Sequence, residues 1–100
     1  MARITGEMAE RMLGEVKDEK QFFCFDGKCM KSLAELEAAL SEMTDDTYRY
    51  HSNEVKTDFS NWVRDVFGDD KLSRDLLKST SRAHAVKKVA SRIAWLRSKT

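Results

Sequence analysis

Four side chains of this 100-residue chain could bind a metal ion or carry thiol chemistry. They are Cys24, Cys29, His51 and His84. Zinc favours thiolate and imidazole ligands, and two cysteines separated by four residues across a glycine turn could form half of a site. The two histidines lie far apart on different predicted helices, so the other half lacks a paired ligand. We therefore expect neither a metal nor a cofactor.

The same cysteines could form a redox pair. An Asp-Gly step at residues 26–27 favours a two-residue type I′ turn, which would place Cys24 opposite Cys29. In that register their Cα atoms would lie about 4.5 Å apart, at the short end of the disulfide range. In a reducing cytosol, two thiols packed side by side are the expected state. A metal- or redox-dependent protein centred on Cys24, Cys29 and His51 stays open as an alternative.

His51 and Asp58, together with Ser52 or Ser60, include the residue types of a hydrolase. No glycine-rich turn frames either serine, and no oxyanion site is evident. Asp58 has a structural explanation, because its charge would face the positive end of a helix dipole. We expect His51 to donate to that carboxylate or to a backbone carbonyl, since a lone histidine lacks the partners of a catalytic site. The chain is thus predicted not to be an enzyme.

Trp95 is an aromatic residue that does not fit the expected core. The core side of the last predicted helix is apolar and consists of Val86, Val89, Ile93 and Leu96. At 100° per residue, Trp95 points almost opposite that side, with Lys88, Arg92 and Lys99 around it. An indole among cations suits docking on an acidic partner or stacking on a nucleic-acid base. The structural alternative is that another element, or another copy of the chain, covers it.

Charge is distributed unevenly along the chain. Residues 1–77 hold 11 basic and 17 acidic side chains, a balance of −6. Residues 78–100 hold seven basic side chains and no acidic one, a balance of +7. This division favours an anionic partner, or a basic helix that lies on the acidic remainder of its own fold.

Length and composition indicate one globular domain. Hydrophobic residues make up 41% and charged residues 35% of the chain, as expected for a packed core and a solvated surface. No apolar run reaches the roughly 18 residues that cross a bilayer, and the N-terminus lacks the pattern of a secretory signal. We therefore expect a cytoplasmic protein with no membrane contact.

The elements that must position these residues are mainly helical, in a mainly α (α+β) fold of about five helices and one short β-hairpin. Periodicity and capping residues predict helices over 5–17, 33–43 and 58–67, a short turn over 44–51 and a hairpin near 21–30. Asp69-Asp70 is expected to start a short helix through Leu77, and Ser79-Thr80-Ser81 to cap the last helix. A capping box at Ser32 and Glu35 starts the second helix, and Gly68 ends the third. Within the single domain, 1–20 form an N-terminal helix and connection, 21–77 a hairpin plus helical core, and 78–100 a basic C-terminal helix.

The predicted core combines the hairpin aromatics with the apolar faces of the helices. Leu77 is expected inside with Leu72 and Leu76. Besides Leu77, the predicted core consists of Phe23, Phe25, Leu33, Leu36, Leu40, Tyr48, Phe59, Trp62, Val63, Val66, Leu72, Leu76, Val86, Val89, Ile93 and Leu96.

One segment resembles a known family. Tyr50-His51 followed by Asp58-Phe59-x-x-Trp62 is similar to the pattern of small prokaryotic, largely archaeal domains of unknown function. The resemblance extends from about Phe23 to Leu76, roughly half of the chain. It implies a compact, mostly helical module in which Tyr50, His51, Asp58, Phe59 and Trp62 are structural. It implies no activity, and the cysteine pair is not part of the pattern.

Together these observations predict a small interaction or regulatory module. Its basic C-terminal helix would contact a protein partner or a second copy of the chain. The residues expected to make this contact are Lys88, Arg92, Trp95 and Lys99. Weak nucleic-acid binding through the same helix is the first alternative, and the metal or redox protein is the second.

Overall fold

Short polar side chains cap most of the helices. In the computed structural model, which describes residues 3–100, Ser32 Oγ accepts from the N–H of Glu35 at 3.1 Å. Thr44, Asp69 and Ser81 make the same kind of contact three residues ahead. The Glu35 carboxylate accepts from the N–H of Lys31 at 2.6 Å. These contacts satisfy amides that have no partner within the helix.

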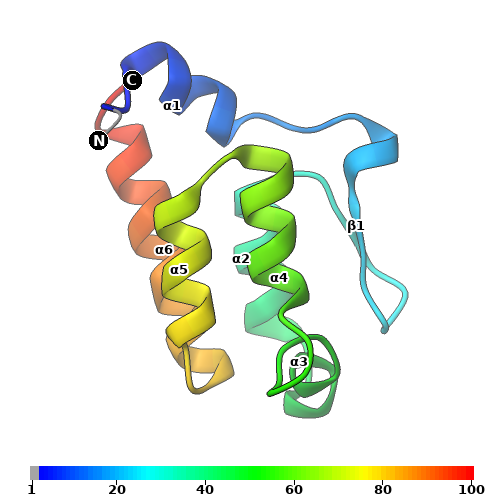
Figure 1. Cartoon of the computed structure of the whole chain (residues 1–100). Coiled ribbons are helices and arrows are strands. Elements are labelled where there is room, and N and C mark those ends of the chain that lie inside the picture. Colours follow the sequence, from blue (N-terminus) through cyan, green and yellow to red (C-terminus); the bar gives the residue numbers. More distant parts are fainter. Residues whose placement is uncertain (1–2) are drawn as a thin grey trace.

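The described chain forms a compact, mainly helical domain of six α-helices and one antiparallel hairpin (Figure 1). The N-terminal elements are α1 (Gly6–Leu13), η1 (Asp18–Lys20), β1 (Phe22–Phe23), β2 (Cys29–Met30), α2 (Leu33–Glu42) and α3 (Asp45–His51). They are followed by α4 (Asp58–Trp62), η2 (Val63–Phe67), α5 (Asp70–Lys78) and α6 (Arg82–Arg97). The mainly helical class with one hairpin is confirmed, and the segment predicted as a short turn is the helix α3.

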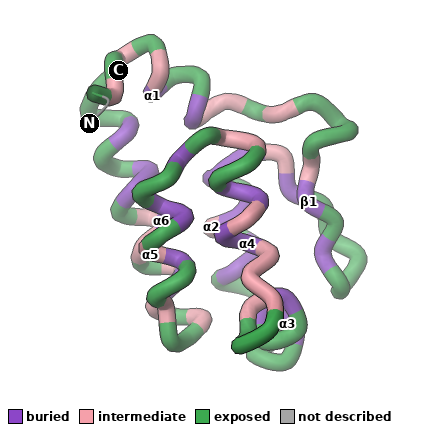
Figure 2. The backbone as a smooth tube through the Cα atoms, in the orientation of Figure 1, coloured by how far each residue is buried: buried purple, intermediate pink, exposed green. Residues whose placement is uncertain are grey.

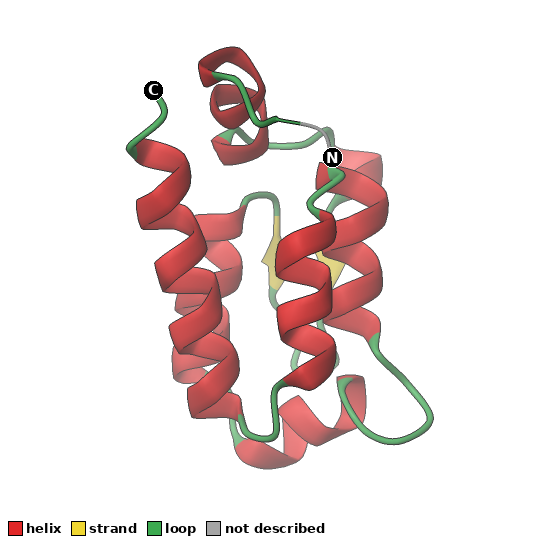
Figure 3. Cartoon of the chain, turned by 60° about the vertical axis from the view of Figure 1, so that its left-hand side comes forward, coloured by secondary structure: helices red, strands yellow, loops and turns green. Residues whose placement is uncertain are grey.

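The helices α2, α4, α5 and α6 form the body of the domain, and α6 packs against α1, α2 and α5. In Figure 1, α6 and the hairpin lie at opposite sides of this body, and α1 lies over the end of α6. In Figure 3 the hairpin side is turned away from the viewer, and the two short strands are seen behind the helices. Buried positions line the faces that the helices turn toward one another (Figure 2).

The N-terminal helix is shorter than its periodicity predicts. It ends at Leu13, because Gly14 adopts an extended conformation with ψ of 171°. The N–H of Val16 then donates to the carbonyl of Lys31 at 2.8 Å. This tertiary hydrogen bond holds the segment extended beside the hairpin, so the prediction of a helix to residue 17 is wrong.

The helix that begins at Asp58 runs unbroken through α4 into η2, whose turn is of the wider π type. Gly68 ends it with φ of 68°, a left-handed conformation that costs glycine little. The N–H of Gly68 donates to the carbonyl of Arg64 at 3.0 Å. The bounds predicted for this helix are confirmed.

The hairpin turn holds three residues, not two. Phe23 pairs with Cys29 and Phe22 with Met30, while the N–H of Cys24 donates to the carbonyl of Lys28. Gly27 has φ of 94°, as expected after a type I turn in a three-residue loop. The predicted pairing of Cys24 with Cys29 is therefore wrong by one residue.

The changed register alters which hairpin side chains are buried. Phe22, Cys24 and Met30 lie in the core, whereas Phe23 and Phe25 are 66% and 64% exposed. A shift of one residue exchanges the two faces of a strand, so the prediction that Phe23 and Phe25 are core residues is wrong.

The helical part of the predicted core is largely confirmed, with three differences. Leu77, expected inside, is 52% exposed, and Val66 and Val86 are only partly buried against the core. The buried helical residues that were predicted are Leu33, Leu36, Leu40, Tyr48, Phe59, Trp62, Val63, Leu72, Leu76, Val89, Ile93 and Leu96.

Candidate partner-binding surface

Trp95 lies on the outer side of α6 and is 40% exposed. The Cζ atom of Arg92 lies 4.6 Å from the centroid of the indole, and Lys99 Nζ lies 4.9 Å from it. Cations at these distances are attracted to the negative face of an aromatic ring. The two contacts hold the indole in place while leaving part of it open to solvent.

The open side of Trp95 faces a groove of about 760 Å³ between α5, α6 and the start of α1. Ile4 and Met8 add apolar side chains to the lining of this groove. The charged residues that line the groove are Arg3, Asp69, Asp70, Lys71, Arg74, Asp75, Lys88, Arg92 and Lys99. All four residues predicted to contact a partner thus line one groove, together with residues from two other helices.

Arg92 is a structural member of this set. Its Nε donates to Asp69 Oδ2 at 2.8 Å, and the two side chains are 9% and 0% exposed. The other Asp69 oxygen caps α5 by accepting from the N–H of Leu72. Because this pair neutralises both charges inside the fold, Arg92 orients Trp95 but has no free charge to offer a ligand.

The free positive charge of the groove comes from other residues. Arg74, Lys88 and Lys99 form no ion pair within residues 3–100, whereas Lys71 Nζ lies 2.7 Å from Asp75. Burial raises the pKa of the Asp75 carboxyl, but the hydrogen bond and charge of Lys71, with the charge of Lys88, lower it more. The pKa of Asp75 therefore lies below its ordinary value, as expected in a positive field.

Part of the basic charge of α6 is used inside the domain. Arg82 Nε donates to Asp45 at 2.9 Å, and its Nη1 donates to the carbonyls of Leu40 and Ser41 at the end of α2. With the Arg92 pair, this places two of the basic residues of α6 on acidic residues of the same fold. Lys88 and Lys99, which also line the groove, form no such pair within residues 3–100.

His51 is buried, and both of its ring nitrogens are engaged. Nε2 accepts from the N–H of Phe25, and Nδ1 lies 2.9 Å from Asp58 Oδ2. Since Nε2 accepts, the ring proton lies on Nδ1 and is donated to the carboxylate. Neither nitrogen has a free lone pair for a metal ion or for a substrate proton, so the contacts of His51 are those of a structural residue.

The other motif residues surround this histidine. The Phe22 ring packs on Phe59, His51 and Trp62 with centroids 5.1 to 5.7 Å apart. The indole N–H of Trp62 donates to the carbonyl of Lys20 at 2.7 Å. The motif therefore attaches the hairpin and the preceding connection to α4. Tyr50 differs, since it is half-exposed and stacks on Phe25.

The two cysteines do not form a site in this structure. Cys24 is buried and Cys29 is exposed, and both thiols are free. Desolvation by burial raises the pKa of the Cys24 thiol, which lowers its reactivity. Nowhere in residues 3–100 do three His, Cys, Asp or Glu side chains come together as metal ligands would.

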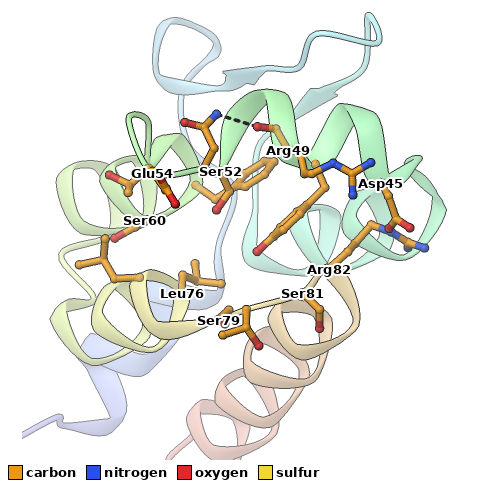
Figure 4. A pocket seen from close by; sticks show the side chains of 15 residues that line it. Asp45, Arg49, Ser52, Glu54, Ser60, Leu76, Ser79, Ser81 and Arg82 are labelled. Carbon is orange, nitrogen blue, oxygen red and sulfur yellow. Dashed lines mark hydrogen bonds and ion pairs between the residues drawn. The ribbon is translucent and has the colours of Figure 1, made fainter.

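A second cavity, of about 740 Å³, lies between the end of α3 and the turn that joins α5 to α6. Figure 4 shows its mixed polar and apolar lining, with Ser52 across from Ser79 and Ser81, and with Asp45 beside Arg82 at one end. Neither His51 nor His84 is among the lining residues. These serines consequently have no imidazole base within the cavity.

Phe23 and Phe25 are exposed residues whose role the sequence does not reveal. Residues 22–25 are apolar on both faces of the strand, so alternation could not indicate which side faces the core. The length of the turn decides which side faces the core. The glycine at position 27 is compatible with a three-residue loop as well as with a two-residue loop, so the sequence does not give that length.

Within residues 3–100, no helix combines the length and apolar character that a membrane span requires. The resemblance to uncharacterised archaeal domains stays a prediction. Comparison of the chain with protein-family models, with curated proteins and with solved structures finds no match.

Proposed function

We propose that this domain is a protein-interaction module, not an enzyme, whose groove beside Trp95 binds an acidic, partly apolar segment of a partner protein. The observation that carries the proposal is the exposed indole beside Lys99, in a groove that Lys88, Ile4 and Met8 also line. Such a groove combines an apolar surface with cations that form no ion pair within residues 3–100. A segment that places a leucine or phenylalanine between carboxylates matches both features.

The energetics favour Trp95 as the centre of the contact. Tryptophan residues that are partly pre-buried often dominate binding energy, because they lose little entropy and bury much apolar area. The Arg92 and Lys99 contacts already restrict the indole. The flanking cations would add electrostatic attraction and would speed association more than they tighten it.

The acidic residues of the groove favour a protein over nucleic acid as the ligand. Asp70 and Asp75 lie on the same wall as Lys71 and Arg74. A phosphate backbone carries a regular, dense negative charge and would be repelled by these carboxylates, whereas a peptide can place its charges only where cations lie.

The proposal can be tested by calorimetric titration of the full chain with a defined peptide of leucines and glutamates. The matched probe replaces each glutamate by lysine. We expect binding of the acidic peptide alone, with an affinity that falls as salt rises. Trp95→Ala should weaken binding by about thirtyfold, as for the central residue of an interface. The double variant Lys88→Ala, Lys99→Ala should weaken it about tenfold.

The matched control is Lys87→Ala, since Lys87 is an exposed lysine of α6 outside the groove. It should bind as the native chain does. Equal binding of the lysine peptide, or an unchanged affinity in Trp95→Ala, would refute the proposal. Tighter binding of a single-stranded oligonucleotide than of the acidic peptide would replace it with the nucleic-acid alternative.

A further inference from the structure

The cavity between the end of α3 and the turn from α5 to α6, here called the Tyr48 cavity, contains a hydroxyl group that the fold does not use. Tyr48 lines this cavity and is only 7% exposed, and its ring stacks on Phe59 with centroids 5.9 Å apart. Its hydroxyl forms no hydrogen bond within residues 3–100. The hydroxyl still reaches solvent, since the one fully buried side-chain N or O atom without a partner in that range is Nδ1 of His84. Because phenylalanine would make the same stack, the phenol is a donor that opens on the cavity.

The turn from α5 to α6 adds hydroxyl donors and acceptors to the Tyr48 cavity. Ser79 Oγ donates to the carbonyl of Asp75 at 2.9 Å, which leaves its lone pairs able to accept. Ser81 Oγ accepts from the N–H of His84 at 3.1 Å, which leaves its own O–H able to donate. Figure 4 shows Ser52 across from these two serines, and no hydrogen bond within residues 3–100 engages its hydroxyl. A ligand in the cavity would therefore meet groups that donate and groups that accept.

The charges of the Tyr48 cavity disfavour an anionic ligand. Arg82 Nε donates to Asp45 at 2.9 Å. Arg49 Nη2 lies 2.8 Å from Asp46 Oδ1. Both arginines of the lining are therefore paired, whereas the exposed Glu54, which also lines the cavity, forms no ion pair within residues 3–100. An anion would meet an unpaired like charge and no unpaired cation.

A neutral molecule with several hydroxyl groups matches this combination. Each sugar hydroxyl both donates and accepts, so one molecule can accept from Tyr48 and donate to Glu54 through different hydroxyls. An ammonium group has no lone pair for the phenol proton, and an alkane would leave the hydroxyls of the cavity without partners. Phe59, Leu76 and Leu77 add apolar surface for the C–H face of a sugar ring. The volume of about 740 Å³ lies within the range of ligand sites and has room for a monosaccharide.

We infer that the Tyr48 cavity binds a neutral monosaccharide, with the phenol of Tyr48 as a donor and the carboxylate of Glu54 as an acceptor. This inference goes beyond the proposed function, because none of the residues that line the Tyr48 cavity lines the groove beside Trp95. The two sites can therefore be tested separately on the same chain.

NMR titration of the full chain with glucose, galactose and mannose tests the inference. We expect at least one of these sugars to shift the amide signals of the residues that line the cavity. The 6-phosphate and the 2-amino derivative of that sugar should bind more weakly than the sugar itself. Tyr48→Phe should weaken binding about fivefold to tenfold, the effect of one hydrogen bond. The matched control is Tyr50→Phe, the same change at a half-exposed tyrosine outside the lining, which should bind as the native chain does.

Two further readouts separate binding from folding. Tyr48→Phe should unfold at the same urea concentration as the native chain, because the hydroxyl has no partner within residues 3–100. Glu54→Gln removes the unpaired charge and keeps an oxygen acceptor, so it should narrow the preference for the sugar over its 6-phosphate about fivefold. Trp95→Ala should leave sugar binding unchanged, which distinguishes this site from the proposed peptide groove. No shift with any of the three sugars, tighter binding of the 6-phosphate, or a Tyr48→Phe variant that binds as tightly as the native chain or is less stable would overturn the inference.

Discussion

His51 Nε2 accepts a hydrogen bond from the N–H of Phe25 at 2.9 Å, across 26 residues of sequence. Its Nδ1 donates to Asp58, at the first residue of α4. One neutral imidazole thereby joins the tip of the hairpin to the start of a core helix. The residue held by this contact, Phe25, stacks its ring on Tyr50 with centroids 4.2 Å apart.

Replacement of His51 by alanine should lower the free energy of unfolding by about 2–4 kcal/mol. The change removes a buried ring and leaves a backbone donor and a carboxylate without their partner. Urea denaturation measures the loss. His84→Ala is the control, since the buried Nδ1 of His84 has no partner in the described chain, and it should change stability by less than about 0.5 kcal/mol. Equal losses in the two variants would contradict the role assigned to His51.

The ion pair between Arg92 and Asp69 should show strong coupling. Arg92→Met leaves the carboxylate of Asp69 buried and uncompensated, which should cost about 3–5 kcal/mol. Asp69→Asn in the same chain removes that charge and keeps an oxygen to accept from Leu72, so the double variant should regain most of the loss. Thermodynamic cycles from chemical denaturation measure the coupling. If the loss of stability in the double variant equals the sum of the losses in the two single variants, Arg92 and Asp69 do not interact energetically.

The lowered pKa of Asp75 predicts a dependence of stability on acid pH. A carboxyl whose pKa is lower in the folded state stabilises the fold above its unfolded pKa, near 3.8. This contribution is lost as pH falls through the folded value. The difference in unfolding free energy between the native chain and Asp75→Asn should thus be largest near neutral pH and shrink below pH 3.8. Lys71→Met should reduce the same pH dependence, because Lys71 is the main group that lowers the pKa.

Gly6 should be required for the packing of α1 on α6. A Cβ atom at this position would lie 2.8 Å from the carbonyl oxygen of Lys99, closer than real contacts allow. Gly6→Ala should therefore destabilise the domain by about 1–3 kcal/mol, although alanine is the better helix former. Hydrogen exchange of the α1 amides, with denaturation, measures the effect.

Gly14→Ala is the matched control for this prediction. Its nearest neighbours would lie 3.5 Å away and its backbone is extended, so the variant should keep or slightly increase stability. If Gly6→Ala is as stable as Gly14→Ala, the close approach of α1 to the end of α6 is refuted. Since Ile4 and Met8 reach the groove beside Trp95 from this segment, Gly6→Ala should also weaken peptide binding.

Local signals in the sequence predicted most of the helical fold. The caps at Ser32, Asp69 and Ser81 occur where expected, because a cap is formed by side chains and amides only a few residues apart. The helix from Asp58 to Phe67 follows from its apolar periodicity and from Gly68. The outward direction of Trp95 follows from helix geometry alone.

The hairpin could not be predicted with the same accuracy. Residues 22–25 are apolar without alternation, and the glycine turn is compatible with loops of two or three residues. The choice between them is made by contacts with distant residues, such as His51 to Phe25 and Phe22 to Phe59. The same limit applies to the end of α1, which depends on the hydrogen bond between Val16 and Lys31.

By itself, the sequence determined that the chain is a mainly helical domain with one hairpin, a basic last helix and an indole off its core face. Only the tertiary structure decided that Arg92 belongs to a buried ion pair, that Ile4 and Met8 join Trp95 in one groove, and that Phe23 and Phe25 face outward. Helix periodicity and caps act over a few residues, whereas these features come from elements that meet across the fold. Whether a side chain is buried or paired depends on which elements pack against it, and a local sequence pattern does not encode that packing.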